Sequence, residues 1–292
     1  MTPRVPRHQL TDDQWNLIAD LFPTRNCKTG RRARDRRTIL NAIFWVLRTG
    51  APWRDLPIEF GPWSTAWDFF NKWNQDGTFD EVLRRLRSCV FRMATHPPSS
   101  GASTARRSAR LAAAAAGGKS TNPEEPKDHA LGRSRGGWGT KIHILCDAHG
   151  HPLHFHLSAG QIHDQTMVDT LLCGADETLH DEHGTPMAWP VALAGDKGYR
   201  ANWVDQYLLE LGIKPIIPSK ENEDRSLRPV AFDKAAYRGR SIIECLIGWL
   251  KESRRIATRF GKKAINFGAM VKLAFIHRYL RLRASCAISD MA

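Results

Sequence analysis

Two runs of alternating apolar and polar residues lie within the segment TKIHILCDAHGHPLHFHLSAG, residues 140–160. In the first run isoleucines alternate with Lys141 and His143, and in the second run leucine and phenylalanine alternate with His154 and His156. A repeat of two residues is typical of a β-strand with one buried face. The letters AHGH between the runs are typical of a turn, so the segment is predicted to form a β-hairpin.

The chain after this hairpin alternates between helix-like and strand-like stretches. The predicted order is a helix around 165–172, a strand at VALAGD (191–196), a helix closed by Gly212, a strand at KPIIPS (214–219) and a long helix from Tyr237. Such an order is typical of a mixed α/β domain in which helices flank a sheet. We therefore expect residues 129–292 to form one α/β domain.

Residues 1–93 have a different pattern, which predicts several short helices. Thr11 followed by Gln14 forms a capping-box pattern before the apolar positions of a first helix. A basic stretch, GRRARDRRTILNAIFWVLRTG (30–50), places arginines at the start of a second helix. Short helices with basic faces favour a small, all-α, helix-turn-helix-like DNA-binding domain. A plain helical bundle with solvated arginines is the alternative.

The residues between these regions, 94–128, read ATHPPSSGASTARRSARLAAAAAGGKSTNPEEPKD. They are rich in Ala, Ser, Pro and Arg, and they show neither the alternation of a strand nor the apolar stripe of a helix. This composition predicts an irregular linker.

Charge and composition limit the classes of function. The 292 residues carry a net charge of +13 and are 42% hydrophobic, which indicates a folded protein with affinity for a polyanion, most simply nucleic acid. Anionic membrane surfaces also attract cations, but no run approaches the roughly 18 apolar residues of a membrane span. The first residues lack the apolar core of a signal peptide, and the six cysteines form no CxxC pair, which favours a reducing cytosol.

The segment YRGRSIIECLIGWLK (237–251) predicts one helix with a polar sector. Four side chains fall within about 60° of one another on that helix: Tyr237, Arg240, Glu244 and Lys251. An ordinary amphipathic helix with a Glu–Arg pair is the alternative interpretation. A second segment, LAGDKGY, places Asp196 at the end of a predicted strand, where a turn residue is the alternative.

These segments resemble the DDE transposases of the insertion sequence 5 group, within the wider insertion sequence 4 superfamily. The matching blocks are the Tyr-Arg-Glu-Lys spacing, LAGDKGY, ALGRSRGGWGTKIHILCDAHGHPL and KPIIPSKENE, which occur in the family's order. The resemblance implies an RNase H-like mixed sheet with flanking helices. It also implies a protein that acts in the cytoplasm, at the nucleoid, as a homo-oligomer on double-stranded DNA.

The resemblance further implies a two-metal site for phosphoryl transfer at the ends of an insertion sequence. Asp196 corresponds to the second acid and Glu244 to the third, and both are expected to bind Mg2+, with Mn2+ as an alternative. Tyr237, Arg240 and Lys251 are expected to contact the terminal repeats or the target DNA. Magnesium prefers oxygen ligands, and paired metals stabilise the attacking and leaving oxygens.

The first catalytic Asp of the family is missing. The family places it on the central strand upstream of GRSRGG, where residues 94–118 of this chain contain no acid. Codons for Trp-Arg-Ile-Asp-Gly-Thr, read one base out of frame, can give Gly-Ala-Ser-Thr-Ala, which are residues 101–105. We explain the change by compensating frameshifts near residues 90–95 and near residue 118. The expected consequences are a lost strand and an impaired enzyme, with a non-catalytic DNA-binding repressor as the alternative function.

The hairpin histidines raise the separate question of a metal site. His143, His149, His151, His154 and His156 lie close together in the sequence, but no cysteine or acid is seen to complete a ligand set. We therefore expect them to lie on a solvated strand face.

Overall fold

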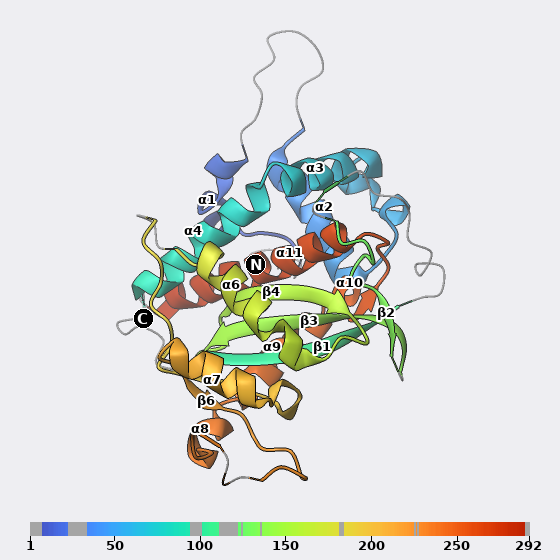
Figure 1. Cartoon of the computed structure of the whole chain (residues 1–292). Helices are drawn as coiled ribbons and strands as arrows, with labels where there is room; N and C mark the ends of the chain where they lie inside the picture. Colours follow the sequence, from blue (N-terminus) through green and yellow to red (C-terminus); the bar gives the residue numbers. More distant parts are fainter. Residues whose placement is uncertain are drawn as a thin grey trace.

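The computed structural model describes residues 8–22, 34–93, 101–110, 122–123, 125–134, 136–180, 184–224, 226 and 228–289 (Figure 1). For residues 91–93, 101–110 and 283–289 it describes the backbone alone. A mixed sheet lies at the centre, and helices from both ends of the chain pack beside it (Figure 1).

The N-terminal region forms short helices, as its pattern predicts. They are α1 (Asp12–Asn16), η1 (Ala19–Leu21), α2 (Arg36–Thr49), η2 (Trp53–Asp55), η3 (Ile58–Phe60), α3 (Trp63–Gln75) and α4 (Thr78–Met93). The capping box before α1 is confirmed, because Thr11 Oγ1 accepts the Gln14 N–H and the Gln14 side chain accepts the Thr11 N–H. Helix α2 begins after Asp35, whose carboxylate accepts two backbone N–H groups, and it ends at Gly50 in the left-handed conformation.

The sheet has seven strands in the described part of the chain. They are β1 (Gly101–Arg110), β2 (Gly132–Ser134), β3 (Gly137–Asp147), β4 (Pro152–Ala159), β5 (Ala192–Gly195), β6 (Lys214–Ile216) and β7 (Thr258–Arg259). The order is β2-β3-β1-β5-β6, with β4 paired to β3 and β7 paired to β1. The predicted hairpin is confirmed as the antiparallel pair β3–β4, and β5 and β6 confirm the two short apolar strands.

Strand β1 corrects the expectation for part of residues 94–128. These residues were expected to be irregular and the first strand to be lost, yet 101–110 form a strand between β3, which is antiparallel, and β5, which is parallel. The strand contains no Val, Ile, Leu or aromatic residue, so its sequence pattern does not predict it. Backbone pairing with neighbours on both sides supplies the missing preference. The rest of the predicted linker up to residue 121 lies outside the described residues.

Helices cover both faces of the sheet. They are η4 (Asp164–Met167), α6 (Val168–Thr178), η5 (Lys197–Tyr199), α7 (Asn202–Glu210), α8 (Lys234–Arg238), α9 (Ser241–Lys251), α10 (Arg254–Ala257) and α11 (Ala264–Ser289). Apolar residues of α6 and α7 pack with Leu145, Leu153 and Leu193 on one face. Apolar residues of α9 and α11 pack with Ile142 and Ile144 on the other face. The result is a three-layer α/β/α arrangement, which agrees with the predicted mixed α/β class.

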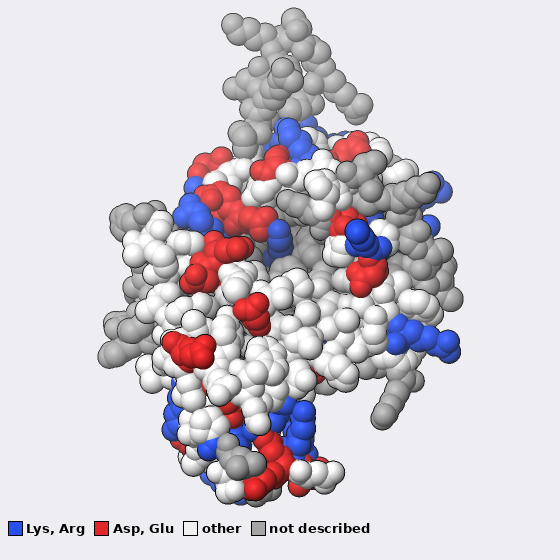
Figure 2. All heavy atoms as spheres, in the orientation of Figure 1, with Lys and Arg blue, Asp and Glu red and all other residues white. Residues whose placement is uncertain are grey.

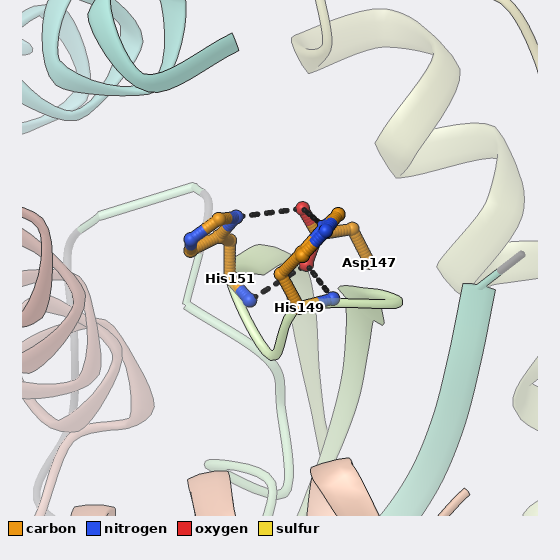
Figure 3. A group of neighbouring side chains, drawn as sticks. All are labelled: Asp147, His149 and His151. Atoms are coloured by element: carbon orange, nitrogen blue, oxygen red, sulfur yellow. Dashed lines mark hydrogen bonds and ion pairs between the residues drawn. The ribbon is translucent and has the colours of Figure 1, made fainter. Parts of the chain in front are cut away.

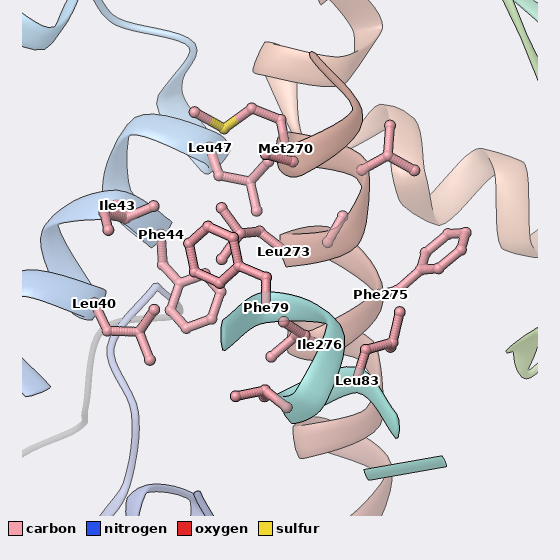
Figure 4. Packing of buried hydrophobic residues seen from close by; sticks show 14 of the residues in the cluster. Leu40, Ile43, Phe44, Leu47, Phe79, Leu83, Met270, Leu273, Phe275 and Ile276 are labelled. Atoms are coloured by element: carbon pink, nitrogen blue, oxygen red, sulfur yellow. The ribbon is translucent and has the colours of Figure 1, made fainter. Parts of the chain in front are cut away.

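The N-terminal helices share their core with the end of the chain. Side chains of α2 and α4 interleave with Met270, Leu273, Phe275 and Ile276 of α11 in one cluster of buried residues (Figure 4). Residues 1–93 were expected to form a separate small domain. The described helices of this region instead bury their apolar faces against α11 and share its core.

The N-terminus of helix α11 is also capped by a residue that is distant in the sequence. The Glu125 carboxylate accepts the Ala264 N–H at 2.6 Å and the Ile265 N–H at 2.9 Å, so it caps the helix from a distant segment. These backbone bonds and the neighbouring His129 lower the pKa of Glu125 against the opposing effect of burial.

Among the described residues, no helix combines the length and the apolar character needed to cross a bilayer.

Candidate functional site

Asp196 lies where the sequence predicts it, at the first position after β5. Its side chain begins the short helix η5 by accepting the Gly198 N–H at 3.0 Å. Leu193, Ala194 and Gly195 before it are buried, whereas Asp196 is half-buried. A carboxylate at this position therefore lies at the C-terminal end of β5, directly beyond the last residue of the strand.

Strand β1 brings a second position beside Asp196. The parallel register places Ser103 of β1 opposite Gly195 of β5. The next residues along the two strands are Thr104 and Asp196. Helix α9, which carries Glu244, also contacts β1. Residue 104 is therefore the next position on the central strand beside Asp196, in a strand that α9 contacts, and it holds a threonine.

Asp164 is a carboxylate near Asp196 that the sequence reasoning missed. A Cβ built on Gly198 would lie 2.5 Å from Asp164 Oδ2 and 3.1 Å from Asp196 Oδ1, so both carboxylates border the same glycine. The other oxygen of Asp164 accepts a bond from Lys141 Nζ at 2.6 Å. Its position directly before a predicted helix is the one sequence signal that marks it.

The segment from Tyr237 to Lys251 is two helices, not the single helix predicted. Helix α8 ends at Arg238, and α9 begins at Ser241. Between them the backbone bonds span three residues, as in Arg240 N–H to the Tyr237 carbonyl, which is the tighter winding of a 3-10 helix. Gly239 stands at this junction, and glycine lowers the preference for an uninterrupted α-helix.

Three of the four predicted residues on this segment still lie together. The Arg240 guanidinium lies 3.1 Å from Glu244 Oε1 and sits over the Tyr237 ring at 5.3 Å from its centroid. Tyr237 in turn meets Phe232 edge to face. Lys251 is the last residue of α9, two turns or about 10 Å along the axis from Glu244, and it is exposed. Lys251 is therefore on the same side of α9 but separate from the Tyr237–Arg240–Glu244 group.

The three-acid metal site implied by the resemblance is not assembled in the described part of the chain. There, a single group of three or more His, Cys, Asp or Glu side chains has its ligand atoms within 4.8 Å, and it contains neither Asp196 nor Glu244. Glu244 is instead paired with Arg240, and Asp196 caps η5. Asp164, the further carboxylate beside Asp196, is bound to Lys141. Without an acid on the central strand, Asp196 and Glu244 do not fit a Mg2+ pair, which needs several oxygen ligands.

Three of the hairpin histidines correct the expectation of a solvated strand face. His143 is fully buried, with Nδ1 3.1 Å from the Tyr199 hydroxyl and Nε2 2.8 Å from the Ser158 hydroxyl. Burial lowers the pKa of His143 to about 4 and that of His154 to about 4 as well. His156 is half-buried, and burial lowers its pKa as well. The reason is that helices cover both faces of the sheet, so the polar positions of β3 and β4 are enclosed too.

Charged side chains do not gather into one basic surface on the face shown in Figure 2. Acidic and basic residues there form separate patches, with a broad uncharged area between them among the described atoms (Figure 2). The net charge of +13 is therefore not expressed as a continuous basic stripe on this face.

Comparison with known proteins identifies the family. A family model described as "Transposase DDE domain" matches residues 117–278, more than half of the chain. A second model, described as "Putative transposase of IS4/5 family", matches residues 10–83. Together they cover both the N-terminal helices and most of the sheet.

Two relatives agree with these models. A "putative transposase for insertion sequence element IS402" of Burkholderia cepacia is 29% identical over 191 residues, 65% of this chain and 83% of that protein. A "putative transposase for insertion sequence element IS6501" of Brucella ovis is 30% identical over 142 residues, 49% of this chain and 98% of that protein. A pre-cleavage Mos1 transpososome aligns with 92% of this chain and 85% of its own at 10% identity, but the TM-score of 0.27 supports no argument about the fold. The chain belongs to the insertion sequence transposases that carry the transposase DDE domain.

Proposed function

We propose that this protein derives from a transposase of the insertion sequence 5 group, with an RNase H-like domain, and that it binds the ends of its element without cutting them efficiently. The observation that carries the proposal is the position of Thr104 beside Asp196 on the central strand. An acid belongs at that position if the site is to hold a pair of Mg2+ ions, and a threonine hydroxyl does not replace it.

The order of the strands supports the RNase H-like assignment. Strand β1 lies in the middle, with the antiparallel strands β3 and β4 on one side and the parallel strands β5 and β6 on the other. Asp196 leaves the sheet at the end of β5, and α9 packs against β1 from one face. This arrangement supports the proposal that an acid from β5, an acid from α9 and residue 104 belong to one site.

The proposed frameshift accounts for threonine at this position. In the out-of-frame reading, the codon for Thr104 takes its first two bases from the Asp codon of Trp-Arg-Ile-Asp-Gly. The register of β1 and the sequence of residues 101–105 are independent of each other, and both support residue 104 as the position of the lost acid. We therefore propose that this copy lost its first acid at Thr104 while the backbone of the strand was kept.

The remaining polar residues are proposed to bind the DNA backbone. Arg240 presents a planar guanidinium, and Lys251 presents an exposed ammonium two turns further along α9. Cations at this spacing can contact phosphates and offset their charge. Arg240 is held by Glu244 and by the Tyr237 ring, which orients its guanidinium before DNA arrives. The partner is double-stranded DNA, bound by a homo-oligomer in the cytoplasm.

Mg2+ would supply charge neutralisation at the scissile phosphate in an intact relative, and Mn2+ could replace it. Because the family's first acid is missing from the described residues of this chain, Asp196 and Glu244 alone do not fit a metal pair. The function favoured for this copy is DNA binding with impaired cleavage. A protein that descends from a transposase would then act as a repressor.

The test is a gain of function at residue 104. End-specific binding and nicking are measured on DNA that carries the inverted repeats flanking the gene, with and without Mg2+. We expect the natural protein to bind without nicking. We expect Thr104→Asp to raise Mg2+-dependent nicking about a hundredfold, because the third carboxylate restores the metal pair.

The matched control is Thr104→Asn, which has nearly the same shape as the aspartate but no charge. It should stay as inactive as the natural protein, and Asp196→Asn should abolish the activity gained by Thr104→Asp. Robust nicking by the natural protein, or a gain with Thr104→Asn, would refute the proposal. Absence of end-specific binding would refute the repressor function as well.

A further inference from the structure

We propose that the turn between β3 and β4 forms a binding site for a transition metal of the Zn2+ class, made by Asp147, His149 and His151. This site is separate from Asp196 and Glu244, and it does not depend on the proposed function. The three side chains surround one point at the end of the hairpin, and their ligand atoms all lie within 4.8 Å of one another (Figure 3).

The turn holds Asp147 in place before any ion binds. Asp147 Oδ1 accepts the backbone N–H of His149 at 2.9 Å and that of His151 at 2.8 Å. The Asp147 N–H donates to the His151 carbonyl, and the Gly150 N–H donates to the Asp147 carbonyl, both at 3.1 Å. The second oxygen of the carboxylate, Oδ2, is turned toward the two imidazoles (Figure 3).

The distances to Oδ2 suit a tetrahedral ion. His151 Nδ1 lies 2.7 Å and His149 Nδ1 lies 3.9 Å from Asp147 Oδ2. Ligands about 2.0–2.1 Å from a tetrahedral Zn2+ are about 3.3 Å from each other, between these two values. The two rings stack with their centroids 5.7 Å apart and an interplanar angle of 23°, and all three ligand atoms lie within 4.8 Å of one another. We infer that rotation of the side chains closes the remaining difference when an ion binds.

The ligand types select the metal. Two imidazoles and one carboxylate favour Zn2+ and its neighbours over Mg2+, which prefers oxygen ligands throughout. When the ion binds, the His151 Nδ1 lone pair faces it and the ring proton lies on Nε2. The His149 side chain is 66% exposed, so water has access to the fourth position. The site is therefore a three-ligand site with one open position.

The surroundings of the turn give the ion a stabilising role. A Cβ on Gly150 would lie 2.9 Å from Ile242 Cγ1, so the turn packs tightly against the first turn of α9. The His151 ring stacks on Tyr279 of α11, and the Tyr279 hydroxyl donates to the Pro152 carbonyl at 2.9 Å. An ion that fixes both histidines would tie the end of the hairpin to α9 and α11.

The experiment uses the untagged, metal-free, full-length protein titrated with Zn2+ against a coloured chelator. We expect one tight equivalent of Zn2+ and a rise in the thermal unfolding midpoint, because an ion bound to the folded state stabilises it. His149→Asn and His151→Asn should each weaken binding about tenfold or more, since each removes one of three ligands. His149 is exposed, so its replacement tests the site without disturbing the core.

Two controls separate this site from other sources of binding. His180→Asn, a half-buried histidine outside the turn, should bind Zn2+ as the natural protein does. The double variant Asp196→Asn/Glu244→Gln should also keep the equivalent, which makes the result independent of the proposed function. With Co2+ in place of Zn2+, the visible absorption bands should disappear in His149→Asn. Absence of tight binding, or binding that survives His149→Asn with His151→Asn, would overturn the proposal.

Discussion

Strands β1 and β5 lie side by side and run in the same direction, but different interactions hold them. Strand β5 follows an apolar pattern, and its Leu193 is buried among side chains of α6 and α7. Strand β1 consists of small and basic residues, yet it occupies the centre of the sheet. The difference between β1 and β5 shows that a central strand meets two separate requirements, backbone pairing and side-chain packing. Any extended segment can satisfy the backbone of its neighbours, whereas chemistry and close packing require particular side chains.

The largest effect is expected where the backbone of β1 is interrupted. Ala102 lies between Cys146 of β3 and Ala194 of β5, so its backbone N–H lies within the sheet and faces one of these two strands. Ala102→Pro removes that donor and should lower the free energy of unfolding by about 3 kcal/mol or more. Urea denaturation measures the change, with Ala102→Ser as a control that keeps the N–H. Equal stability of the two variants would mean that β1 contributes little to the sheet.

A slightly smaller effect is expected from the side chains of β5. Leu193→Ala removes a side chain that is only 5% exposed and should cost about 2–4 kcal/mol, because it leaves a cavity against α6 and α7. Val191→Ala, two residues earlier and 70% exposed, should change stability by less than about 0.5 kcal/mol. The same urea denaturation measures both variants. A loss for Val191→Ala as large as that for Leu193→Ala would contradict the view that side-chain burial holds β5.

The smallest effect concerns His143, which pairs with Ala105 of β1 in the register of β3. Burial lowers its pKa to about 4, so the unfolded chain binds more protons than the folded chain between pH 4 and the usual histidine range near 6.5. Stability is therefore present above pH 6.5 and is lost as the pH falls toward 4. The loss from pH 7 to pH 5 is expected to be about 2 kcal/mol from this residue.

Urea denaturation at several pH values measures that dependence. His143→Gln keeps a polar side chain but cannot titrate, so its stability should fall less steeply between pH 7 and pH 5. A slope as steep as that of the natural protein would show that His143 is charged, or that other groups dominate.

The sequence predicts those elements in which local pattern and tertiary position agree. The β3–β4 hairpin, the short strand before Asp196 and the capping box at Thr11 all follow from residue spacing alone. Strand β1 does not follow, because its preference comes from neighbours that are distant in the sequence. The shared core of α2, α4 and α11 is hidden for the same reason, since amphipathic spacing marks an apolar face but not its partner.

The candidate sites divide in a similar way. The positions of Asp196 and of Tyr237, Arg240 and Glu244 follow from their motifs, although the break at Gly239 does not. Asp164 and Asp196 are distant in the sequence and lie close together only in the folded sheet. The residues around Asp164 therefore give little indication that it belongs near Asp196. No acid was expected to complete a ligand set with the hairpin histidines, and only the fold of the turn shows that Asp147 faces His149 and His151.

The core that joins α2 to α11 also bears on how the chain is made. Helix α2 ends at Thr49, and α11 does not begin until Ala264, so a ribosome releases the first helix long before its partner exists. During that interval Ile43, Phe44 and Leu47 have no α11 to cover them. Proteins with such distant contacts fold late and are prone to aggregate when synthesis stops early. A fragment that ends before α11 would therefore be prone to aggregate, because its N-terminal helices would lack the helix that covers their apolar faces.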